Sequence, residues 1–351
     1  MGAETGSAMP APGAGEPAAE ELGARDTTPS VLTVIVAHAP GDWFDETLES
    51  FATQDYQRLE VMVVDAAGDP SLAVRVQSHL PEASVLDASD TDGFSAAANA
   101  LLDTHVDPVF LMICHDDIAL EPDAVRLLVV ESLRSNAGIV GPKLVDWDNP
   151  DRLQHVAYIV DRLAVAADVV EPGEIDQEQY DAVVDVFAVP SACILIRTDL
   201  FRDLDGFDPG MPYHCEDVDL CFRAQLAGAR VMAVPDARVR HRQALSTRTG
   251  AHDDGLLRAR HQLRTVMVTS SFPSLCYLLP FALLFSFGES IAALFARRFG
   301  HFRDIWGAWL WNLSRSGEIH SRRRALRHIR RTRHKDVRTL QQGGVYGSKR
   351  C

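Results

Sequence analysis

The sequence predicts an α/β fold, with a mainly parallel β-sheet covered by helices on both faces and a helical region after it. Nearly continuous β-branched runs, such as residues 31–37 and 60–65, are typical of strands buried on both faces. These runs alternate with segments whose apolar residues have helical spacing, and strand–helix–strand order favours parallel pairing. A change of composition near residue 265 marks the start of the helical region.

The first half of the sheet follows a predicted leader. Residues 1–30 are rich in Ala, Gly, Pro and Glu and bury too little apolar area to offset their ordering entropy, so we expect them to be disordered. The elements expected next are a strand at 31–37, a helix at 42–54, a strand at 60–65, a helix at 72–80, a strand at 84–86, a helix at 94–102, a strand at 109–113 and a helix from 122 to about 134. Pro122 suits a first helical turn, where its missing N–H costs nothing.

The second half of the sheet has shorter elements. They are strands at 139–144 and 183–197, the latter interrupted at 190–192, a loop at 206–210, a helix at 216–228 and short strands at 231–234 and 238–241. Gly228 is the expected C-terminal stop of the helix. Ligands of parallel sheets bind beyond the carboxyl ends of strands, and Asp65, Asp116 and Asp117 occupy such ends.

The composition is globular and gives some information on location. Of the 351 residues, 46% are hydrophobic and 24% are charged, which excludes collagen-like and coiled-coil chains. The six cysteines show no C-x-x-C pair or zinc spacing, so we expect reduced thiols in a cytosolic setting. Small and acidic residues follow Met1, and therefore no signal peptide is expected.

The formal charge of −15 is unevenly distributed. Residues 297–351 hold 15 Lys and Arg against three acids, a charge of +12, so the remainder carries −27. Phosphate contacts need a basic surface, and we therefore expect no nucleic acid partner for the acidic part. The sequence predicts a molecule of two parts with opposite charge.

An uncharged stretch over residues 265–288 predicts contact with a membrane. It is long enough to span ~30 Å of hydrocarbon. However, a single crossing would place the +12 tail outside, against the positive-inside tendency, and Pro273, Pro280 and Glu289 break the pattern. We expect a monotopic or re-entrant segment, with the tail on anionic lipid at the cytoplasmic face. A helical hairpin buried against the sheet domain is the alternative.

Two acidic clusters and one histidine are candidate site residues. His115, Asp116 and Asp117 directly follow an apolar strand, and adjacent carboxylates there suit a hard divalent cation that also holds a diphosphate. The same acids also suit a solvated turn that caps the next helix, and both alternatives stay open. His241 ends a short strand. A lone histidine is more often structural, although imidazole is a usual ligand of transition-type cations.

Three acids, Glu216, Asp217 and Asp219, open a predicted helix. The helix dipole favours acids at this end, which is a purely structural explanation. The chemical alternative is a general base beside a second carboxylate that orients an acceptor hydroxyl.

Five ordered segments together resemble the inverting family 2 glycosyltransferases with a GT-A fold, in particular their rhamnosyl- and galactofuranosyltransferase-like branch. The resemblance spans residues 31–242. The segments are VLTVIVAHAPGDWFDETLESFATQDYQRLEVMVVDAAGDPS, DGFSAAANALL, VFLMICHDDIALEPDAV, GIVGPKLV and VFAVPSACILIRTDLFRDLDGFDPGMPYHCEDVDLCFRAQLAGARVMAVPDARVRHR.

The resemblance implies which residues bind the donor and the metal. The family's acid at the end of the second strand, here Asp65, faces the nucleotide base. The other positions in donor-binding segments are Ala37, His38, Gly93, Asn99 and Asp116. The metal, Mn²⁺ or Mg²⁺, is implied at Asp117 and His241, with His115 in a position that often holds aspartate.

The resemblance also assigns the acids at 216–219. It implies that Asp217 is the general base and that Glu216 binds a neighbouring hydroxyl of the acceptor substrate, while Asp219 secures the start of the helix. The implied reaction is metal-dependent, inverting transfer from a nucleotide diphosphate sugar to a glycolipid or cell-envelope glycan, at the cytoplasmic face of the cell membrane. The Q-x-x-R-W signature of processive synthases is absent, which implies single or few additions.

The implied organisation is a leader at 1–30, a GT-A domain at 31–245, a helical region with the apolar segment at 246–296 and a basic helical tail at 297–351. Two other functions were weighed. A non-catalytic, nucleotide-sugar-binding membrane scaffold is favoured only by His115 in the metal motif. A sugar-phosphate nucleotidyltransferase needs a Gly-rich basic loop after the first strand, whereas AHAPGDW is acidic with one Gly.

Overall fold

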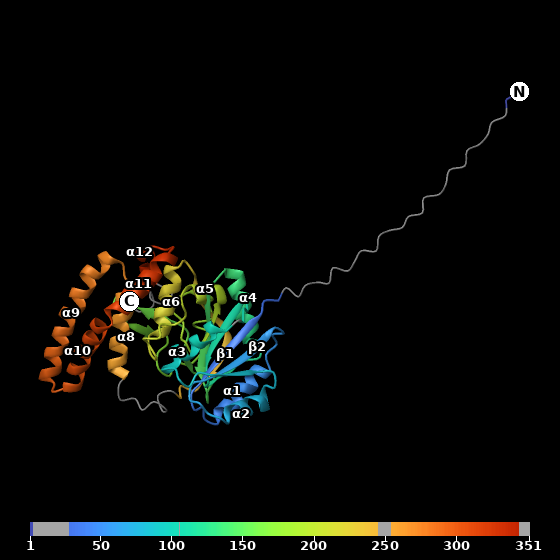
Figure 1. Cartoon of the computed structure of the whole chain (residues 1–351), viewed down its shortest axis with the longest axis horizontal. Coiled ribbons are helices and arrows are strands. Elements are labelled where there is room, and N and C mark those ends of the chain that lie inside the picture. Colours follow the sequence, from blue (N-terminus) through green and yellow to red (C-terminus); the bar gives the residue numbers. More distant parts are fainter. Residues whose placement is uncertain (3–27, 105, 245–253, 344–351) are drawn as a thin grey trace.

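The computed structural model describes residues 1–2, 28–104, 106–244 and 254–343. Most of the predicted leader lies outside these residues. Figure 1 shows a sheet domain with α1, α2 and β2 at one end of the molecule and the C-terminal helices at the other.

Ten strands form one sheet in the described part of the chain, in the order β10-β12-β6-β11-β4-β1-β2-β3, with β5 beside β12 and β7 beside β6. They are β1 (Val31–Ala37), β2 (Leu59–Asp65), β3 (Ser84–Asp87), β4 (Phe110–His115), β5 (Ile118–Leu120), β6 (Ile139–Asp146), β7 (Leu153–His155), β10 (Val184–Asp185), β11 (Cys193–Arg197) and β12 (Val231–His241). A separate antiparallel pair consists of β8 (Tyr158–Val160) and β9 (Ala166–Asp168).

The first half of the sheet is parallel, as predicted, and the second half is mixed. β1 pairs in parallel with β2 and β4, and β2 with β3. β11 then runs antiparallel between β4 and β6. Its apolar run is almost wholly buried, and such a run carries no sign of strand direction. The expectation of a mainly parallel sheet therefore holds for the pairing of β6 with β12 but not for β11, which is antiparallel to both of its neighbours.

Helices cover both faces of the sheet. They are α1 (Trp43–Ala52), α2 (Leu72–His79), α3 (Gly93–Asn99) with the 3₁₀ turn η1 (Ala100–Asp103), α4 (Ala124–Ser135), α5 (Thr198–Asp203) and α6 (Glu216–Leu226). Side chains of α1, α2 and α4 fill the core on one face, and those of α3, α5 and α6 fill the core on the other. All of α6 is buried, so acids on this helix need specific partners.

Some local expectations were wrong. The two strands expected at 231–234 and 238–241 are one strand, β12, with an irregularity between Val234 and Arg238. β7, β8 and β9 were not predicted. Strands of three residues depend on their pairing partners more than on their own sequence.

Within the described residues 254–343, the helices after the sheet domain are α8 (Asp254–Thr269), α9 (Phe272–Phe295), α10 (Phe299–Ser314), α11 (Ser316–Ile329) and α12 (His334–Gly343). α8 contacts α6, α10 and α11. The uncharged stretch at 265–288 is divided between two helices, because α8 ends at Thr269 and Pro273 lies in the first turn of α9.

Buried ion pairs join these helices to the sheet domain. The guanidinium of Arg264 on α8 donates from Nε to Asp208 Oδ2 at 2.8 Å and from Nη2 to Asp208 Oδ1 at 3.0 Å. Arg322 of α11 approaches the same carboxylate, with Nε 3.2 Å from Oδ1. Asp208 is inaccessible to solvent, and its charge is balanced from α8 and α11 together.

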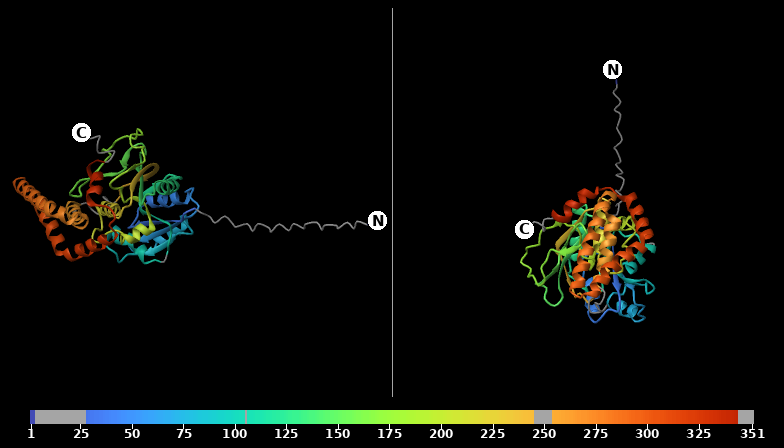
Figure 2. Two further views of the ribbon diagram at one scale, coloured as in Figure 1. Left: turned by 90° about the horizontal axis from the view of Figure 1, so that it is seen from above. Right: turned by 90° about the vertical axis from the view of Figure 1, so that its left-hand side faces the viewer.

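Among the described residues, α9 alone is long and apolar enough to cross a membrane, and little of it is buried. Phe281, Leu284 and Phe285 are more than half exposed. The alternative of a hairpin buried against the domain is therefore wrong for α9. Figure 2 shows α9 and α10 as the outer layer of this end of the molecule.

Candidate active site

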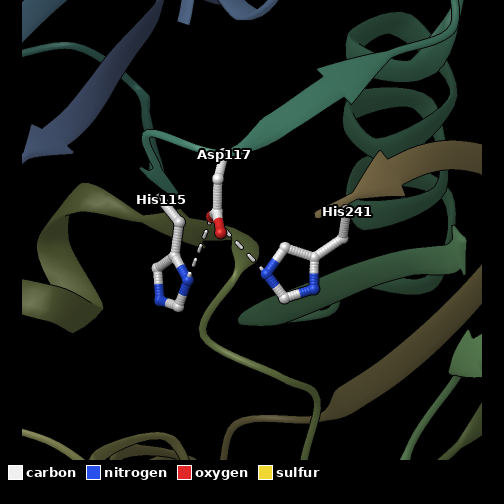
Figure 3. Close-up of side chains that lie close together, drawn as sticks. All are labelled: His115, Asp117 and His241. Carbon is white, nitrogen blue, oxygen red and sulfur yellow. Dashed lines mark ion pairs between the residues drawn. The ribbon is translucent and has the colours of Figure 1, made fainter. Parts of the chain in front are cut away.

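Strand pairing brings Asp117 and His241 together. Asp117 lies between β4 and β5, and β5 runs antiparallel to the end of β12, with Ile118 opposite His241. His241 Nε2 lies 3.5 Å from Asp117 Oδ1, and His115 Nδ1 lies 3.8 Å from the same oxygen. Figure 3 shows the carboxylate between the two rings. One ligand atom from each residue lies within 4.8 Å of the others.

The Asp117 carboxylate is buried, with 1% of its surface exposed. Its Oδ2 accepts the Ala244 N–H at 2.7 Å, while Oδ1 accepts no hydrogen bond from the described residues. Burial alone would raise the pKa of Asp117, but the contact with His241 and the charges of both imidazoles hold it well below its usual range. An ionised, partly unsatisfied carboxylate that faces two imidazoles fits a divalent cation. This donor set suits a transition-type ion better than Mg²⁺, which prefers oxygen.

Asp116 joins the site to the loop after β1. Its Oδ2 accepts the His38 N–H at 2.9 Å, and its carbonyl oxygen accepts the Thr47 hydroxyl at 3.2 Å. Asp116 and Asp117 are both buried, and α4 begins only at Ala124. The alternative of a solvated turn that caps this helix is therefore wrong.

Ala37 and Asp65 end neighbouring parallel strands in register. Asp65 Oδ1 accepts the N–H groups of Ala67 at 3.0 Å and Gly68 at 2.8 Å, and these bonds shape the loop after β2. The expected donor contacts Ala37, His38, Asp65 and Asp116 thus lie at one carboxyl edge of the sheet, where ligands of such folds bind.

Gly93 and Asn99 lie on α3. Gly93 has a φ of +79°, and a Cβ there would come within 2.4 Å of the Pro212 Cβ, so the position requires glycine. The Asn99 amide donates to the Phe207 carbonyl and accepts the Phe207 N–H, both at 2.9 Å. Because both of its polar atoms bond inside the protein, we assign Asn99 to the attachment of α3 and leave it out of the donor contacts proposed below.

Glu216 and Asp217 form a second buried group at the start of α6, 6% and 7% exposed. The Ser191 hydroxyl donates to Glu216 Oε1 at 2.8 Å, and the Ser191 N–H donates to Asp217 Oδ2 at 3.3 Å. Val218 N–H binds the other Asp217 oxygen at 2.8 Å. The two carboxylates are therefore held next to each other from two sides.

This environment weakens the acidity of both groups. Burial, together with the charge of Asp217, raises the pKa of Glu216 to about 8. Burial also raises the pKa of Asp217. Because neighbouring carboxylates titrate as a pair, the pair retains a proton near neutral pH.

Asp219 differs from its two neighbours. Its Oδ2 accepts the Arg223 Nε–H at 2.6 Å, and Arg223 also donates to the carbonyls of Leu204 and Gly206 at 2.9 Å. Asp219 is fully buried within this network. It therefore holds α6 against the preceding loop.

Ser191 and Ala192 connect the two groups of site residues. Ser191 binds both carboxylates of the acidic pair, and the Ala192 carbonyl accepts the His115 N–H at 3.0 Å. The segment at 190–192, where an interruption was predicted, thus forms hydrogen bonds to the His115–Asp117–His241 group and to the acidic pair.

No sequence pattern indicates His155, which lies at the end of β7 near both groups. His155 Nδ1 contacts Asp168 Oδ2, and its Nε2 lies 3.0 Å from Gln243 Nε2. The neighbouring Gln154 donates to the His241 carbonyl at 2.8 Å. Burial raises the pKa of Asp217, and the charge of His155 acts against that rise. Only the pairing of β7 with β6 and of β8 with β9 brings these residues together.

Comparison with known proteins gives a family for this arrangement. The model described as "Glycosyltransferase like family 2" matches residues 29–262. The N-acetylglucosaminyl-diphospho-decaprenol L-rhamnosyltransferase of Mycobacterium tuberculosis is 25% identical over 242 residues, which cover 62% of this chain and 78% of that protein.

Two further relatives match over shorter segments. The O-antigen biosynthesis protein RfbC of Myxococcus xanthus is 26% identical over 41% of this chain, and the rhamnosyltransferase WbbL of Escherichia coli is 46% identical over 16%. These matches span 12% and 20% of those proteins.

Among solved structures, GalNAc-T7 with UDP, GalNAc and Mn²⁺ has a TM-score of 0.57 at 15% identity, covering 69% of this chain and 49% of that one. This likeness confirms the GT-A fold that the sequence resemblance implied.

Proposed function

This chain belongs to glycosyltransferase-like family 2, and on that premise we propose that it transfers a sugar, with inversion, from a nucleotide diphosphate sugar to a hydroxyl of a glycolipid or cell-envelope glycan. The single observation that carries the proposal is the connection through Ser191 and Ala192 between a candidate cation site and a buried acidic pair. The relative named for transfer to a diphospho-decaprenol-linked sugar supports a lipid-linked acceptor.

On the donor side, Asp117, His241 and His115 would hold Mn²⁺. The buried, unsatisfied Asp117 Oδ1 and the two imidazoles support this assignment. A cation bound there would act as a Lewis acid and offset the charge that develops on the diphosphate leaving group. Ala37, His38, Asp65, Gly93 and Asp116 would form the adjoining donor contacts.

On the acceptor side, we assign the general base to Asp217. In its ionised form it takes the proton of the acceptor hydroxyl while that oxygen attacks the anomeric carbon from the face opposite the diphosphate. The N–H groups of Ser191 and Val218 hold its carboxylate in place. Glu216, whose pKa burial and the charge of Asp217 raise to about 8, would bind a neighbouring hydroxyl of the acceptor.

The test is a donor screen followed by a transfer assay. UDP-, GDP- and dTDP-sugars are titrated by calorimetry with Mn²⁺ present, and the donor that binds is incubated with a polyprenyl-diphosphate-linked sugar. We expect a product of inverted anomeric configuration by NMR, formed only without EDTA. Donor binding without any transfer would favour the scaffold alternative, and a retained configuration would contradict the mechanism.

We further propose that α9 places the enzyme on the cytoplasmic face of the membrane. Its exposed Phe281, Leu284 and Phe285 support contact with a membrane, and the basic charge of residues 297–351 favours the cytoplasmic side. Replacing all three by Ser should move the full chain from the membrane pellet to the supernatant with an unchanged unfolding temperature. The matched control replaces Val130 and Leu133, exposed apolar residues of α4, and should stay in the pellet. A triple variant that still sediments would contradict the proposal.

A further inference from the structure

A row of cationic side chains on α11 encloses a cavity of about 260 Å³. Its lining residues, spaced along one helix face, are His320, Arg323, Arg324 and Arg327. Among the described residues, none of these four forms an ion pair with a carboxylate. Residues 297–351 hold 15 Lys and Arg against three acids, so the tail itself offers few carboxylates to neutralise this cluster.

Neighbouring arginines of the same helix have structural partners. Arg322 contacts Asp208, and Arg323 donates to the carbonyls of Met267 and Val268. Arg330 donates to the Thr269 carbonyl at 2.7 Å. Arg323 and Arg330 therefore bind the last carbonyls of α8, because the end of a helix leaves its carbonyl acceptors without partners inside the helix.

Arg324 and Arg327 differ from the arginines with structural partners. Both are exposed, and no carboxylate in the described chain neutralises them. Their charge also acts on their neighbours. Burial lowers the pKa of Arg323, and the charges of Arg327 and Arg330 lower it further. A bound anion would relieve this repulsion between like charges.

The cavity lies at the base of the apolar helix. Arg323 and Arg330 bind the end of α8, and α9 begins three residues later at Phe272, which is 70% exposed. Proteins that lie on anionic membranes place apolar side chains at the boundary of the acyl chains and cationic side chains beside them at the level of the headgroups.

We propose that the cavity on α11 binds the phosphate of an anionic phospholipid headgroup and thereby selects an anionic leaflet. The inference rests on the membrane location proposed above and is independent of the transfer chemistry. His320, Arg324 and Arg327 supply the charge, while Arg323 forms the floor and stays fixed to α8.

None of the residues assigned to the donor, the cation or the acidic pair lines the cavity. Arg331 and Thr332, just beyond α11, donate their N–H groups to the Leu226 carbonyl at the last residue of α6. Glu216 and Asp217 begin that helix, and its 11 residues correspond to a length of about 16 Å at 1.5 Å per residue. The reacting groups therefore lie at the opposite end of α6 from the residues that directly follow α11.

The experiment compares the full chain with two variants of equal charge. R324Q/R327Q removes the two exposed cavity arginines, and the control R152Q/R162Q removes two exposed arginines of the sheet domain. Each protein is floated with phosphatidylcholine vesicles and with vesicles of phosphatidylcholine and phosphatidylglycerol in equal parts. A cation near the surface contributes about fivefold to binding, so R324Q/R327Q should bind the anionic vesicles about 30-fold more weakly. Binding to neutral vesicles should not change.

Several outcomes would overturn the proposal. An equal loss with the control would show that total charge, not the cavity, decides binding. A loss on neutral vesicles as well would show damage to the helices. Inorganic diphosphate could also bind to the wild type in calorimetry and not to R324Q/R327Q. If the wild type then bound neutral and anionic vesicles equally, the cavity would be a site for soluble anions. An oligonucleotide affinity lost in the variant, with vesicle binding kept, would identify nucleic acid as the partner.

Transfer to a soluble acceptor analogue separates this proposal from the proposed function. R324Q/R327Q should keep the wild-type transfer rate in detergent. If the chain shows no transfer at all, vesicle binding still decides the role of the cavity.

Discussion

Carboxylates at the two ends of the candidate site are equally buried but have opposite acid–base character. Asp117 is 1% exposed, and the contact with His241 and the charges of two imidazoles hold its pKa below the usual range. Glu216 and Asp217 are 6% and 7% exposed, and burial raises the pKa of each, with the charge of Asp217 adding to the rise at Glu216. The partners of a buried acid, rather than its burial, decide whether it suits a cation or a proton. The following predictions test this difference, from the largest expected effect to the smallest.

Replacing Asp117 by Ala should abolish EDTA-sensitive turnover. The variant removes the carboxylate that both imidazoles face, so Mn²⁺ binding measured by calorimetry should also disappear. The control D90A removes an exposed acid and should keep both. Equal activity in D117A and wild type would refute the assignment of the cation site.

Replacing Asp217 by Asn should reduce turnover by about 10²–10⁴-fold, because shape is kept and basicity is lost. Donor affinity measured by calorimetry should stay unchanged, since Asp65 and the cation site are untouched. A variant that loses donor affinity but keeps its turnover rate would show that Asp217 belongs to the donor site.

Replacing Glu216 by Gln should shift the pH dependence of turnover. In the wild type, activity should rise with pH as the pair loses its proton, and Glu216 has a pKa of about 8. Repulsion between the carboxylates is mutual, so loss of the Glu216 charge lowers the pKa of Asp217. The acidic limb of the profile should therefore move to lower pH. An unmoved limb would show that the two groups titrate independently.

Replacing His155 by Asn should have the smallest effect and the opposite direction. The charge of His155 opposes the rise that burial causes in the pKa of Asp217. Its loss should move the acidic limb to higher pH and lower turnover at neutral pH by less than about tenfold. A shift in the same direction as that of Glu216→Gln would contradict this role.

The sequence predicted those strands and helices whose own residue pattern is sufficient to specify them. The run at Val31–Ala37 specifies a buried strand whatever its neighbours are, and its bounds agree with the structure. β7, β8 and β9 have three residues each and pair as short hairpins with β6 and with each other. Strands of this length show no clear alternating pattern, and therefore His155 and Asp168 could not be predicted as neighbours. Asn99 illustrates the same limit, because its partner is the main chain of Phe207, which no side-chain pattern reveals.

The site was predictable where residue type and strand position coincide. Asp116 and Asp117 follow a strand directly, and residues at such ends meet at one edge of the sheet. The proximity of Asp117 to His241 followed only from the family resemblance, because it depends on the antiparallel pairing of β5 with β12. The structure brings these residues together, while their roles stay proposals.

The buried carboxylate of Asp208 bears on how this protein can be divided. Its charge is balanced by Arg264 and Arg322, which belong to α8 and α11. Deletion of residues 266–351 would cut through α8 and remove Arg322, and loss of one partner from a buried ion pair costs about 3–5 kcal/mol. The C-terminal helices are thus not a detachable part that could be fused to or removed from an autonomous enzyme. A form of the protein with a less apolar surface would have to come from substitutions on the outer surface of α9, with every helix retained.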